Sequence, residues 1–294
     1  MPGTTLITDG DGPAYVAAAT VKRLDTGIRR FQQAILAQMF MAKAQFVRIH
    51  LTASSSHKAG RFNMLGVKPY QGNRDNKSKP ALLEPLRQAM ANPENWLPEF
   101  YVEMHHVLEA DDGMIMDAYR LKDQGIIRSD DKDLRMTPYP YYDIKAGSVR
   151  TGEPFGWLQP SCAPAGTVKL IGQGPLFFWA QMLMGDTADN VQGILRFDEK
   201  KCGPSGAYQA LKDVKDIHEA ANTVISGYRA IDQNPLPEGW MLWLLRWEGD
   251  TFWQYLQELN ISDDNRRFLE DCAGRKWFDE GGEASSEPDG FVEG

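Results

Sequence analysis

Near the N-terminus, the segment Leu6-Ile7-Thr8-Asp9-Gly10-Asp11-Gly12-Pro13 joins a short apolar strand to a carboxylate and then to a helix. Its first three residues suit a buried strand that ends at Asp9, and proline is tolerated in the first turn of a helix. Open α/β sheets bind their ligands beyond the carboxyl ends of their strands. The segment therefore predicts an α/β protein in which Asp9 lies at the ligand-binding edge of the sheet.

Further along the chain, strands and helices are predicted to alternate. A helix is expected at about 26–43, where apolar residues recur at spacings of three to four. Such alternation predicts a mostly parallel central sheet flanked by helices. The other expected elements are strands at 45–51, 100–102 and 125–129 and helices at 80–90, 109–119 and 176–184.

The composition is that of one globular domain or two closely packed subdomains, since 42% of the 294 residues are hydrophobic and 24% are charged. We expect an α/β catalytic core over 1–175, which includes a basic segment at about 54–95, and a mainly helical region over 176–278. The Gly- and Pro-rich part at 143–174 predicts hairpins and loops. Residues 279–294 hold six acids and no base, which predicts an acidic disordered tail.

Several features bear on the compartment. The longest apolar runs fall well short of the roughly 20 residues that span a bilayer, and the N-terminus lacks the pattern of a signal peptide. Three widely spaced cysteines predict neither a disulfide framework nor a zinc site. We therefore expect a cytoplasmic protein without a membrane partner, and a monomer.

Carboxylates gather at four separated places, 9–11, 109–112, 130–133 and 186–189. If they converge, repulsion and desolvation would destabilise the site until divalent cations neutralise it. The ligands are all oxygen atoms, so Mg²⁺ is expected, with Mn²⁺ able to substitute. His105-His106 are expected to be structural. The predicted metal ligands are Asp9, Glu109, Asp111, Asp112, Asp131, Asp133, Asp186 and Asp189.

The spacing of these acids predicts how they face one another. Glu109 and Asp112 are three residues apart and would share a helix face, and the same spacing recurs at the ends of 186–189. Asp131 and Asp133 would point the same way if a strand continued through them. A single cluster could be the acidic first turn of a helix, but four together favour two metal ions about 4 Å apart, which suit phosphoryl chemistry.

A basic segment accompanies the acids. From Ser54 to Lys79 there are six bases and one acid. Bases beside an acidic centre are expected when the substrate is a polyanion that is cut at the metals. A solvated lysine-rich loop is the alternative.

The order of these motifs resembles the flap endonuclease family, most closely the 5′-to-3′ exonucleases of phages. Glu109-Ala-Asp111-Asp112 is similar to the family's helix motif, and 185–193 is similar to its Gly-Asp-x-x-Asp-Asn-x-x-Gly motif. Residues 69–74, Pro-Tyr-Gln-Gly-Asn-Arg, resemble the start of its helical arch. The resemblance covers about 5–212. It implies a PIN-like fold with that arch and a C-terminal helix-two-turn-helix region.

The resemblance also implies roles for single residues. Tyr70 is expected to stack on a nucleotide base and Arg74 to bind the scissile phosphate. Residues 202–207 resemble a glycine hairpin that grips the DNA backbone and binds a monovalent cation. The predicted catalytic residues are Arg74, Lys77 and Asp112, and the predicted DNA-binding residues are Tyr70, Arg74, Lys77, Lys79, Gly203, Ser205 and Gly206.

Two departures from the family pattern stand out. The lysine of the family's arch is Gln71 in this chain, which removes a cation near the scissile phosphate; Lys68 or Lys77 could take its place. The family's aspartate after the second strand is missing, because His50-Leu-Thr-Ala-Ser54 contains no carboxylate. Both departures predict weaker or differently tuned activity.

The function predicted from the sequence is a two-metal 5′-to-3′ exonuclease or flap endonuclease. Its substrate would be DNA with a 5′ end, as duplex, overhang or flap, with RNA primer strands as a further substrate, and its role phage replication or nucleotide recycling. Two alternatives stay open. One is a non-catalytic DNA-end-binding module of the same fold. The other is a haloacid-dehalogenase-like phosphatase that uses Asp9 and Asp11.

Overall fold

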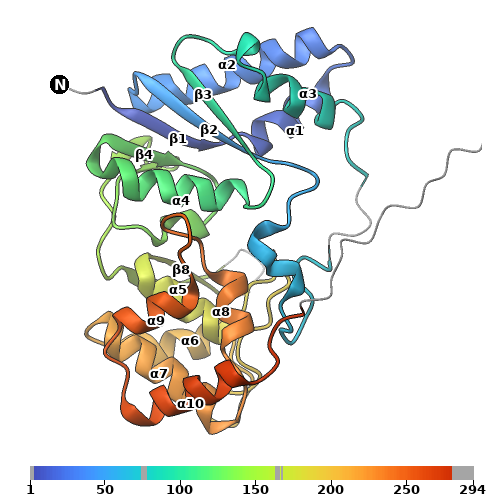
Figure 1. The fold of residues 1–294 in the computed structure, drawn as a ribbon. Coiled ribbons are helices and arrows are strands. Elements are labelled where there is room, and N and C mark those ends of the chain that lie inside the picture. The colour runs from blue at the N-terminus through green and yellow to red at the C-terminus, as the bar shows by residue number, and fades with distance from the viewer. Residues whose placement is uncertain (1–2, 74–77, 163–165, 167, 280–294) are drawn as a thin grey trace, which may run out of the picture.

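A computed structural model describes residues 3–73, 78–162, 166 and 168–279. Its centre is a six-stranded sheet in the order β3-β2-β1-β4-β5-β6, in which only the β5–β6 pair is antiparallel (Figure 1). The predicted α/β fold with a mostly parallel sheet is confirmed. The strands are β1 (Thr5–Asp9), β2 (Phe46–Thr52), β3 (Phe100–His105), β4 (Gly125–Arg128), β5 (Tyr141–Asp143) and β6 (Ser148–Arg150).

Helices cover both faces of this sheet. On one face lie α1 (Asp11–Thr20), α2 (Leu24–Ala42) and α3 (Leu83–Ala91), and on the other lies α4 (Ala110–Leu121) (Figure 1). Side chains alternate along β1, so Leu6 packs into the core under α2 while Ile7 packs against α4. Both side chains are fully buried, which fixes the register that places Asp9 at the strand end.

The second half of the described chain is mainly helical. It begins with the antiparallel pair β7 (Trp157–Cys162) and β8 (Val168–Gln173). Aromatic rings fill its core, and Trp243 stacks on Tyr255 at 4.3 Å between ring centroids. The helices are α5 (Gly174–Met184), α6 (Pro204–Leu211), α7 (Ile217–Ala230), α8 (Leu236–Leu242), α9 (Phe252–Glu258) and α10 (Asp263–Gly274).

Short 3-10 helices connect these elements. The strand does not continue through Asp131 and Asp133, because β4 ends at Arg128, close to the predicted end at 129, and the chain turns. The Asp131 carboxylate accepts a hydrogen bond from the backbone N–H of Asp133 at 2.9 Å, which closes that turn. The 3-10 helices are η1 (Lys58–Asn63), η2 (Pro93–Asn95), η3 (Lys122–Gln124) and η4 (Asp133–Met136).

Two expectations concern other parts of the chain. Within the residues that the structure describes, no helix combines the length and apolar character needed to cross a membrane. The expected acidic tail lies outside the described residues, apart from Asp279.

Candidate metal centre

The ends of three parallel strands bring one group of acids together. Asp9 ends β1, Asp111 lies in the first turn of α4 after β3, and Asp131 follows β4. Burial raises the pKa of Asp111 well above its usual range, and the charges of Asp131 and Asp9 raise it further. Burial and the charges of Asp11 and Asp131 raise the pKa of Asp9 to about 7. These carboxylates therefore repel one another.

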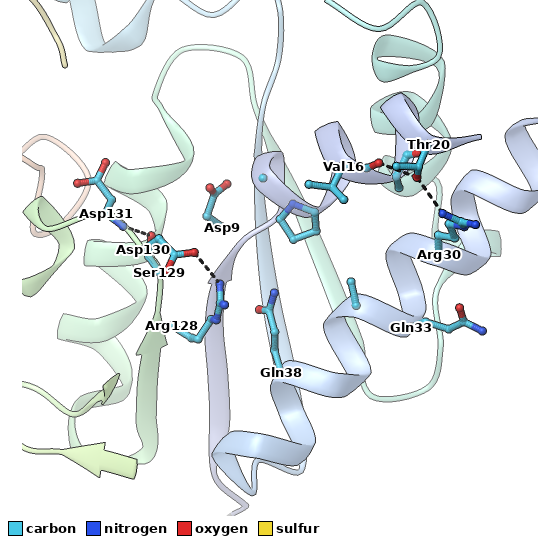
Figure 2. Close-up of a pocket in the computed structure, with 14 residues that line it drawn as sticks. Asp9, Val16, Thr20, Arg30, Gln33, Gln38, Arg128, Ser129, Asp130 and Asp131 are labelled. Atoms are coloured by element: carbon cyan, nitrogen blue, oxygen red, sulfur yellow. Dashed lines mark hydrogen bonds and ion pairs between the residues drawn. The ribbon is translucent and has the colours of Figure 1, made fainter. Parts of the chain in front are cut away.

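Asp9 and Asp131 line the same cavity of about 890 Å³. In Figure 2 both carboxylates lie at the strand ends, Asp9 between β4 and the start of α1. Arg128 belongs to the lining too, and its guanidinium lies 3.7 Å from Asp130. Asp131 is exposed, so solvent reaches these acids through the cavity.

A second group contains Asp133, Asp186 and Asp189, whose carboxylates each place one oxygen within 4.8 Å of the others. Lys132 lies against this group, with its ammonium 3.0 Å from Asp133 and 2.5 Å from Asp186. Burial raises the pKa of Asp133 to about 7, whereas the contact with Lys132 outweighs burial and lowers the pKa of Asp186. The structure thus already places a cation at these oxygens.

A tight turn, not a helix, holds Asp186 and Asp189. The backbones of Asp186 and Val191 exchange two hydrogen bonds, at 2.9 and 2.7 Å. Gly185 has φ +74°, and a Cβ there would come 2.4 Å from the carbonyl oxygen of Val191. Only glycine suits that position. The expected shared helix face is wrong here, yet the turn still brings the two acids together.

The two most specific motifs of the sequence contact each other. The backbone N–H of Gln71 donates to the carbonyl of Asp189 at 2.8 Å, and the Gln71 amide donates to the Asp189 carboxylate at 2.8 Å. In the reverse direction, Asn190 donates to the carbonyl of Pro69 at 2.8 Å. The segment 69–73 is therefore docked on the acidic turn.

Tyr70 is turned inward in this segment. Its side chain is 5% exposed, and its hydroxyl donates to Glu109 at 2.7 Å. Lys58 lies beside them, with its ammonium 3.1 Å from Glu109 and in contact with the side-chain carbonyl of Gln71. In this conformation the ring is not open to a nucleotide base, and Lys58 supplies a cation next to Gln71.

Asp112 forms a buried ion pair with Arg61, unlike the acids that line the cavity. Both of its oxygens accept hydrogen bonds from Arg61, at 2.7 and 2.8 Å, and backbone N–H groups of Glu109 and Leu245 donate to it at 3.1 Å. Burial alone would raise the pKa of Asp112, but the Arg61 guanidinium lowers it below its usual range. Arg61 also donates to the carbonyl of Trp243 at 2.6 Å, so the pair joins α4 to the helical region.

A second cavity, of about 570 Å³, has a mixed lining. Its acids include Asp9 and Asp111, and its bases are Lys58, Lys79 and Arg87. Arg87 comes from α3 and lies 2.9 Å from Asp11. Arg74 and Lys77, two predicted catalytic residues, lie outside the described residues.

The residues of the predicted DNA-binding hairpin lie at the start of α6. A separate pair of backbone hydrogen bonds joins Phe197 and Lys200, upstream of these glycines. Gly203 is the residue that precedes α6, and Ser205 is exposed in its first turn. The structure does not bring these residues into either cavity.

Comparisons with known proteins support the fold. A scan against models of protein families and a search of curated proteins both found no match. Solved structures do match: the zinc-bound 5′-exonuclease of bacteriophage T5 superposes with a TM-score of 0.54 at 14% identity, over 92% of this chain and 98% of that one. The T5 flap endonuclease, solved in a pseudo-enzyme–product complex with DNA and metal ions, gives 0.51 at the same identity and coverage.

This chain has the fold of the T5 flap endonuclease. A further T5 structure, co-crystallised with metal ions, gives a TM-score of 0.52 over the same shares of both chains. The predicted resemblance to phage 5′-to-3′ exonucleases is thereby confirmed at the level of the fold.

The donor set of the two acidic groups fits hard divalent cations. Burial and mutual repulsion raise the pKa of Asp9 and Asp111, so a cation between them would relieve a cost of the folded state. At the other group, the Lys132 ammonium stands in for such a cation. All candidate ligands are carboxylates, which suit Mg²⁺ or Mn²⁺.

Several contacts around these acids were not predicted. Lys58 and Arg61 belong to the basic segment, but the sequence assigns them no partner. The ion pairs that Arg87 and Lys132 form with acids were also not predicted. The position of Lys132 between the candidate ligands Asp131 and Asp133 could have indicated its contact with an acid. No feature of the sequence indicated the contact of Arg87 with Asp11.

Without divalent cations, the folded protein is expected to lose stability as the pH rises from about 4 to about 7. Asp9 and Asp133 have folded-state pKa values of about 7, so the native protein binds protons that unfolded carboxyl groups have already released in this range. The melting temperature in chelator should fall between pH 5 and 7, and Mg²⁺ should reduce that fall. His105, with a pKa lowered to about 4, acts in the opposite sense below about pH 6.5. Asp9→Asn should flatten the fall, and an equal slope in both proteins would contradict the assignment.

Proposed function

We propose that this protein is a divalent-metal-dependent 5′ nuclease that hydrolyses phosphodiester bonds of DNA. The observation that carries the proposal is the convergence of carboxylates in two places, at the strand ends around Asp111 and in the turns that hold Asp133, Asp186 and Asp189, beside a cavity lined with acids and bases. That arrangement suits a polyanion bound over metal ions. The T5 flap endonuclease of similar fold was crystallised with DNA and metal ions, which supports the same substrate class.

We assign the acids to two sets of ligands. Asp9, Asp111 and Asp131 would hold one ion, and Asp133, Asp186 and Asp189 the other. Bound Mg²⁺ would supply an activated water and neutralise charge on the phosphate. The sequence-based assignment of Asp112 as a metal ligand changes here, because Arg61 and two backbone amides already use its oxygens.

The bases along the mixed cavity would orient the strand. Lys58, Lys79 and Arg87 present positive charge beside the acids and would hold phosphates of the DNA backbone. Arg74 and Lys77 keep their proposed roles at the scissile phosphate. Tyr70 would stack on a base only after the hydrogen bond from its hydroxyl to Glu109 breaks. Substrate binding would therefore be coupled to the loss of this hydrogen bond.

Other proposals rest on the resemblance. Residues 203–206 would bind the duplex backbone at the N-terminus of α6, together with a monovalent cation. RNA primer strands would be a further substrate. A monomer acting in the cytoplasm of a phage-infected host, in replication or nucleotide recycling, is the setting that we propose.

A second candidate function is a DNA-end-binding module without hydrolysis. Lys132 favours it, because its ammonium occupies oxygens that a metal ion would need. A phosphatase that uses Asp11 as its acid is less well supported, since Arg87 and the backbone N–H of Thr52 hold that carboxylate.

Cleavage of one duplex with a 5′ overhang, labelled at either end of the same strand, tests the proposal. With Mg²⁺, a 5′ nuclease should release short products from the 5′-labelled strand, while the 3′ label stays on long fragments at early times. Short products from the 3′ label would contradict the polarity. DNA binding without any product would favour the second candidate.

Lys58→Ala is expected to lower the single-turnover cleavage rate by about 10- to 100-fold, because Lys58 is the cation next to Gln71. Lys58→Arg should keep most of the activity, since it retains the charge. The matched control is Lys22→Ala, which removes a lysine from the loop between α1 and α2. A Lys58→Ala rate equal to that of the control would remove Lys58 from the site.

A further inference from the structure

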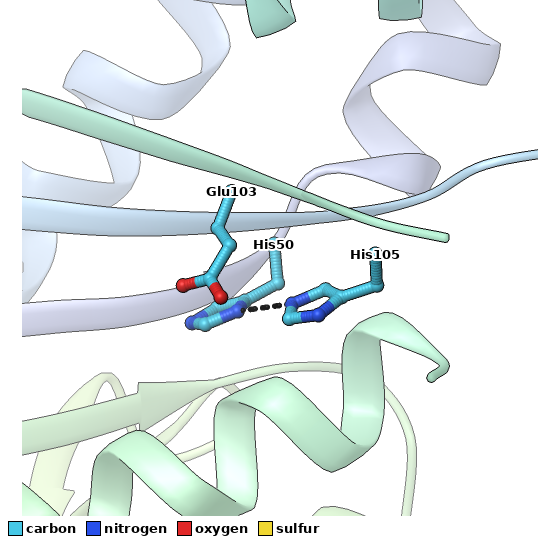
Figure 3. Close-up of side chains that lie close together, drawn as sticks. All are labelled: His50, Glu103 and His105. Atoms are coloured by element: carbon cyan, nitrogen blue, oxygen red, sulfur yellow. Dashed lines mark hydrogen bonds between the residues drawn. The ribbon is translucent and has the colours of Figure 1, made fainter. Parts of the chain in front are cut away.

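Two histidines from adjacent strands face each other on the side of the sheet that α4 covers. His50 on β2 and His105 on β3 place Nδ1 and Nε2 only 2.9 Å apart. Their rings are nearly parallel, with centroids 5.2 Å apart and an angle of 11°. Figure 3 shows Glu103, also on β3, with its carboxylate beside the two rings. The three side chains each offer one ligand atom within 4.8 Å of the others.

A carboxylate behind His50 sets its tautomer. The Nε2 of His50 lies 3.0 Å from Asp117, which Arg120 also contacts at 2.6 Å. The ionised Asp117 can only accept, so Nε2 carries the proton and the Nδ1 lone pair points at His105. Histidines that bind metals commonly donate their other N–H to a carboxylate in this way.

We infer that His50, His105 and Glu103 form a binding site for a transition-metal ion of the Zn²⁺ class, separate from the acidic centre. Two imidazole nitrogens and one carboxylate oxygen are ligands that zinc accepts, with a fourth position left to water. Two nitrogens at about 2.0–2.1 Å from a tetrahedral ion stand roughly 3.4 Å apart. From their present 2.9 Å, the ring nitrogens would need to separate by about 0.5 Å, and the two nearly parallel rings would need to turn so that both lone pairs point at the ion.

The surroundings provide both burial and access. His50 is 1% exposed and His105 is 7% exposed, while the Glu103 side chain is 41% exposed. Glu103 lies on the wall of another cavity of about 570 Å³, together with Asp117 and Arg48. An ion would therefore enter past Glu103 and compete with Arg48, which lies 3.1 Å from that carboxylate.

Helix α4 leaves room for the pair because its nearest residue is glycine. A Cβ on Gly113 would come 2.2 Å from Nε2 of His105 and 2.6 Å from Nδ1 of His50. The same helix carries Asp111 two residues earlier, at the acidic centre. An ion bound between the histidines would thus stabilise the strands under the helix that presents those acids.

Equilibrium dialysis against Zn²⁺ in excess Mg²⁺ tests this site, because Mg²⁺ competes for carboxylate centres but poorly for imidazole. The wild-type protein should retain about one equivalent of Zn²⁺. His105→Asn and Glu103→Gln should each weaken that binding at least about tenfold, and Co²⁺ bound to the wild type should show a visible absorption spectrum that His105→Asn lacks.

Asp186→Asn is the matched control, since it changes the acidic centre and leaves the histidines intact. It should bind the same equivalent of Zn²⁺ as the wild type. Glu103→Gln decides the question if His105→Asn does not fold, because Glu103 is partly exposed. Absence of Mg²⁺-resistant Zn²⁺ binding in the wild type, or unchanged binding in Glu103→Gln and His105→Asn, would overturn the inference.

Discussion

Asp111→Asn is expected to stabilise the protein in chelator and to lower Mg²⁺-dependent DNA cleavage by more than about a hundredfold. Replacement of a residue behind a metal ligand typically costs about 10- to 100-fold, so loss of a ligand should cost more. The gain in stability has a separate cause. Burial and the charges of Asp131 and Asp9 raise the pKa of Asp111 well above its usual range, so its ionised form destabilises the fold.

The sign of the stability effect depends on pH. Below the unfolded-state pKa of about 4, Asp111 is protonated in both states and the substitution should change little. At pH 8 the folded wild type must either bury a charged Asp111 or bind a proton that the unfolded chain has released, and both lower its free energy of unfolding. The Asp111→Asn variant avoids both costs. Melting temperatures at pH 4 and pH 8 in chelator, measured beside cleavage rates, check both parts. A variant that is less stable than wild type at pH 8, or that cuts at the normal rate, would contradict the account.

Arg61→Met is expected to lower the free energy of unfolding by about 3–5 kcal/mol. The substitution leaves Asp112, which is 0% exposed, without its charge partner, and leaves the Trp243 carbonyl without its donor. Breaking one half of a buried ion pair is costly because the other charge remains buried. Urea unfolding measures the change.

The double variant Arg61→Met, Asp112→Asn provides the control. An asparagine carries no charge and still accepts one of the two hydrogen bonds that the backbone N–H groups of Glu109 and Leu245 donate to separate oxygens of Asp112. The double variant should therefore regain part of the stability that Arg61→Met loses. If Arg61→Met unfolds within about 1 kcal/mol of the wild type, the pair does not join the two halves of the protein as described.

The sheet could be predicted from sequence because its signals are local. Leu6-Ile7-Thr8 before Asp9, and the helical spacing at 26–43, each fall on the observed element, β1 and α2. Periodicity in a short window reports which face of an element is buried. It does not report the conformation of the residues that follow a strand, and so the turn that holds Asp131 and Asp133 could not be predicted.

The candidate site was less predictable because its contacts cross the chain. Arg61 meets Asp112 and Trp243, which lie 51 and 182 residues away. Gln71 meets Asp189 across 118 residues. The spacing of the acids could predict that carboxylates gather. It could not predict that Arg61 binds both oxygens of Asp112 and so keeps them from a metal ion. The segment that begins at His50 was noted only because it contains no carboxylate. The contact of His50 with His105 on the adjacent strand had no signal in the sequence.

The most direct measurement is the Mg²⁺-dependent rate of product release from a 5′-labelled duplex with a 5′ overhang, for the wild type and Asp186→Asn. Asp186 is a suitable target because asparagine has nearly the same shape and its oxygen can still accept the hydrogen bond from the backbone N–H of Ala188. The account predicts cleavage by the wild type that chelator abolishes, and loss of that cleavage in the variant without loss of fold. Equal cleavage by both proteins, or cleavage that persists in chelator, would contradict a carboxylate-held metal centre.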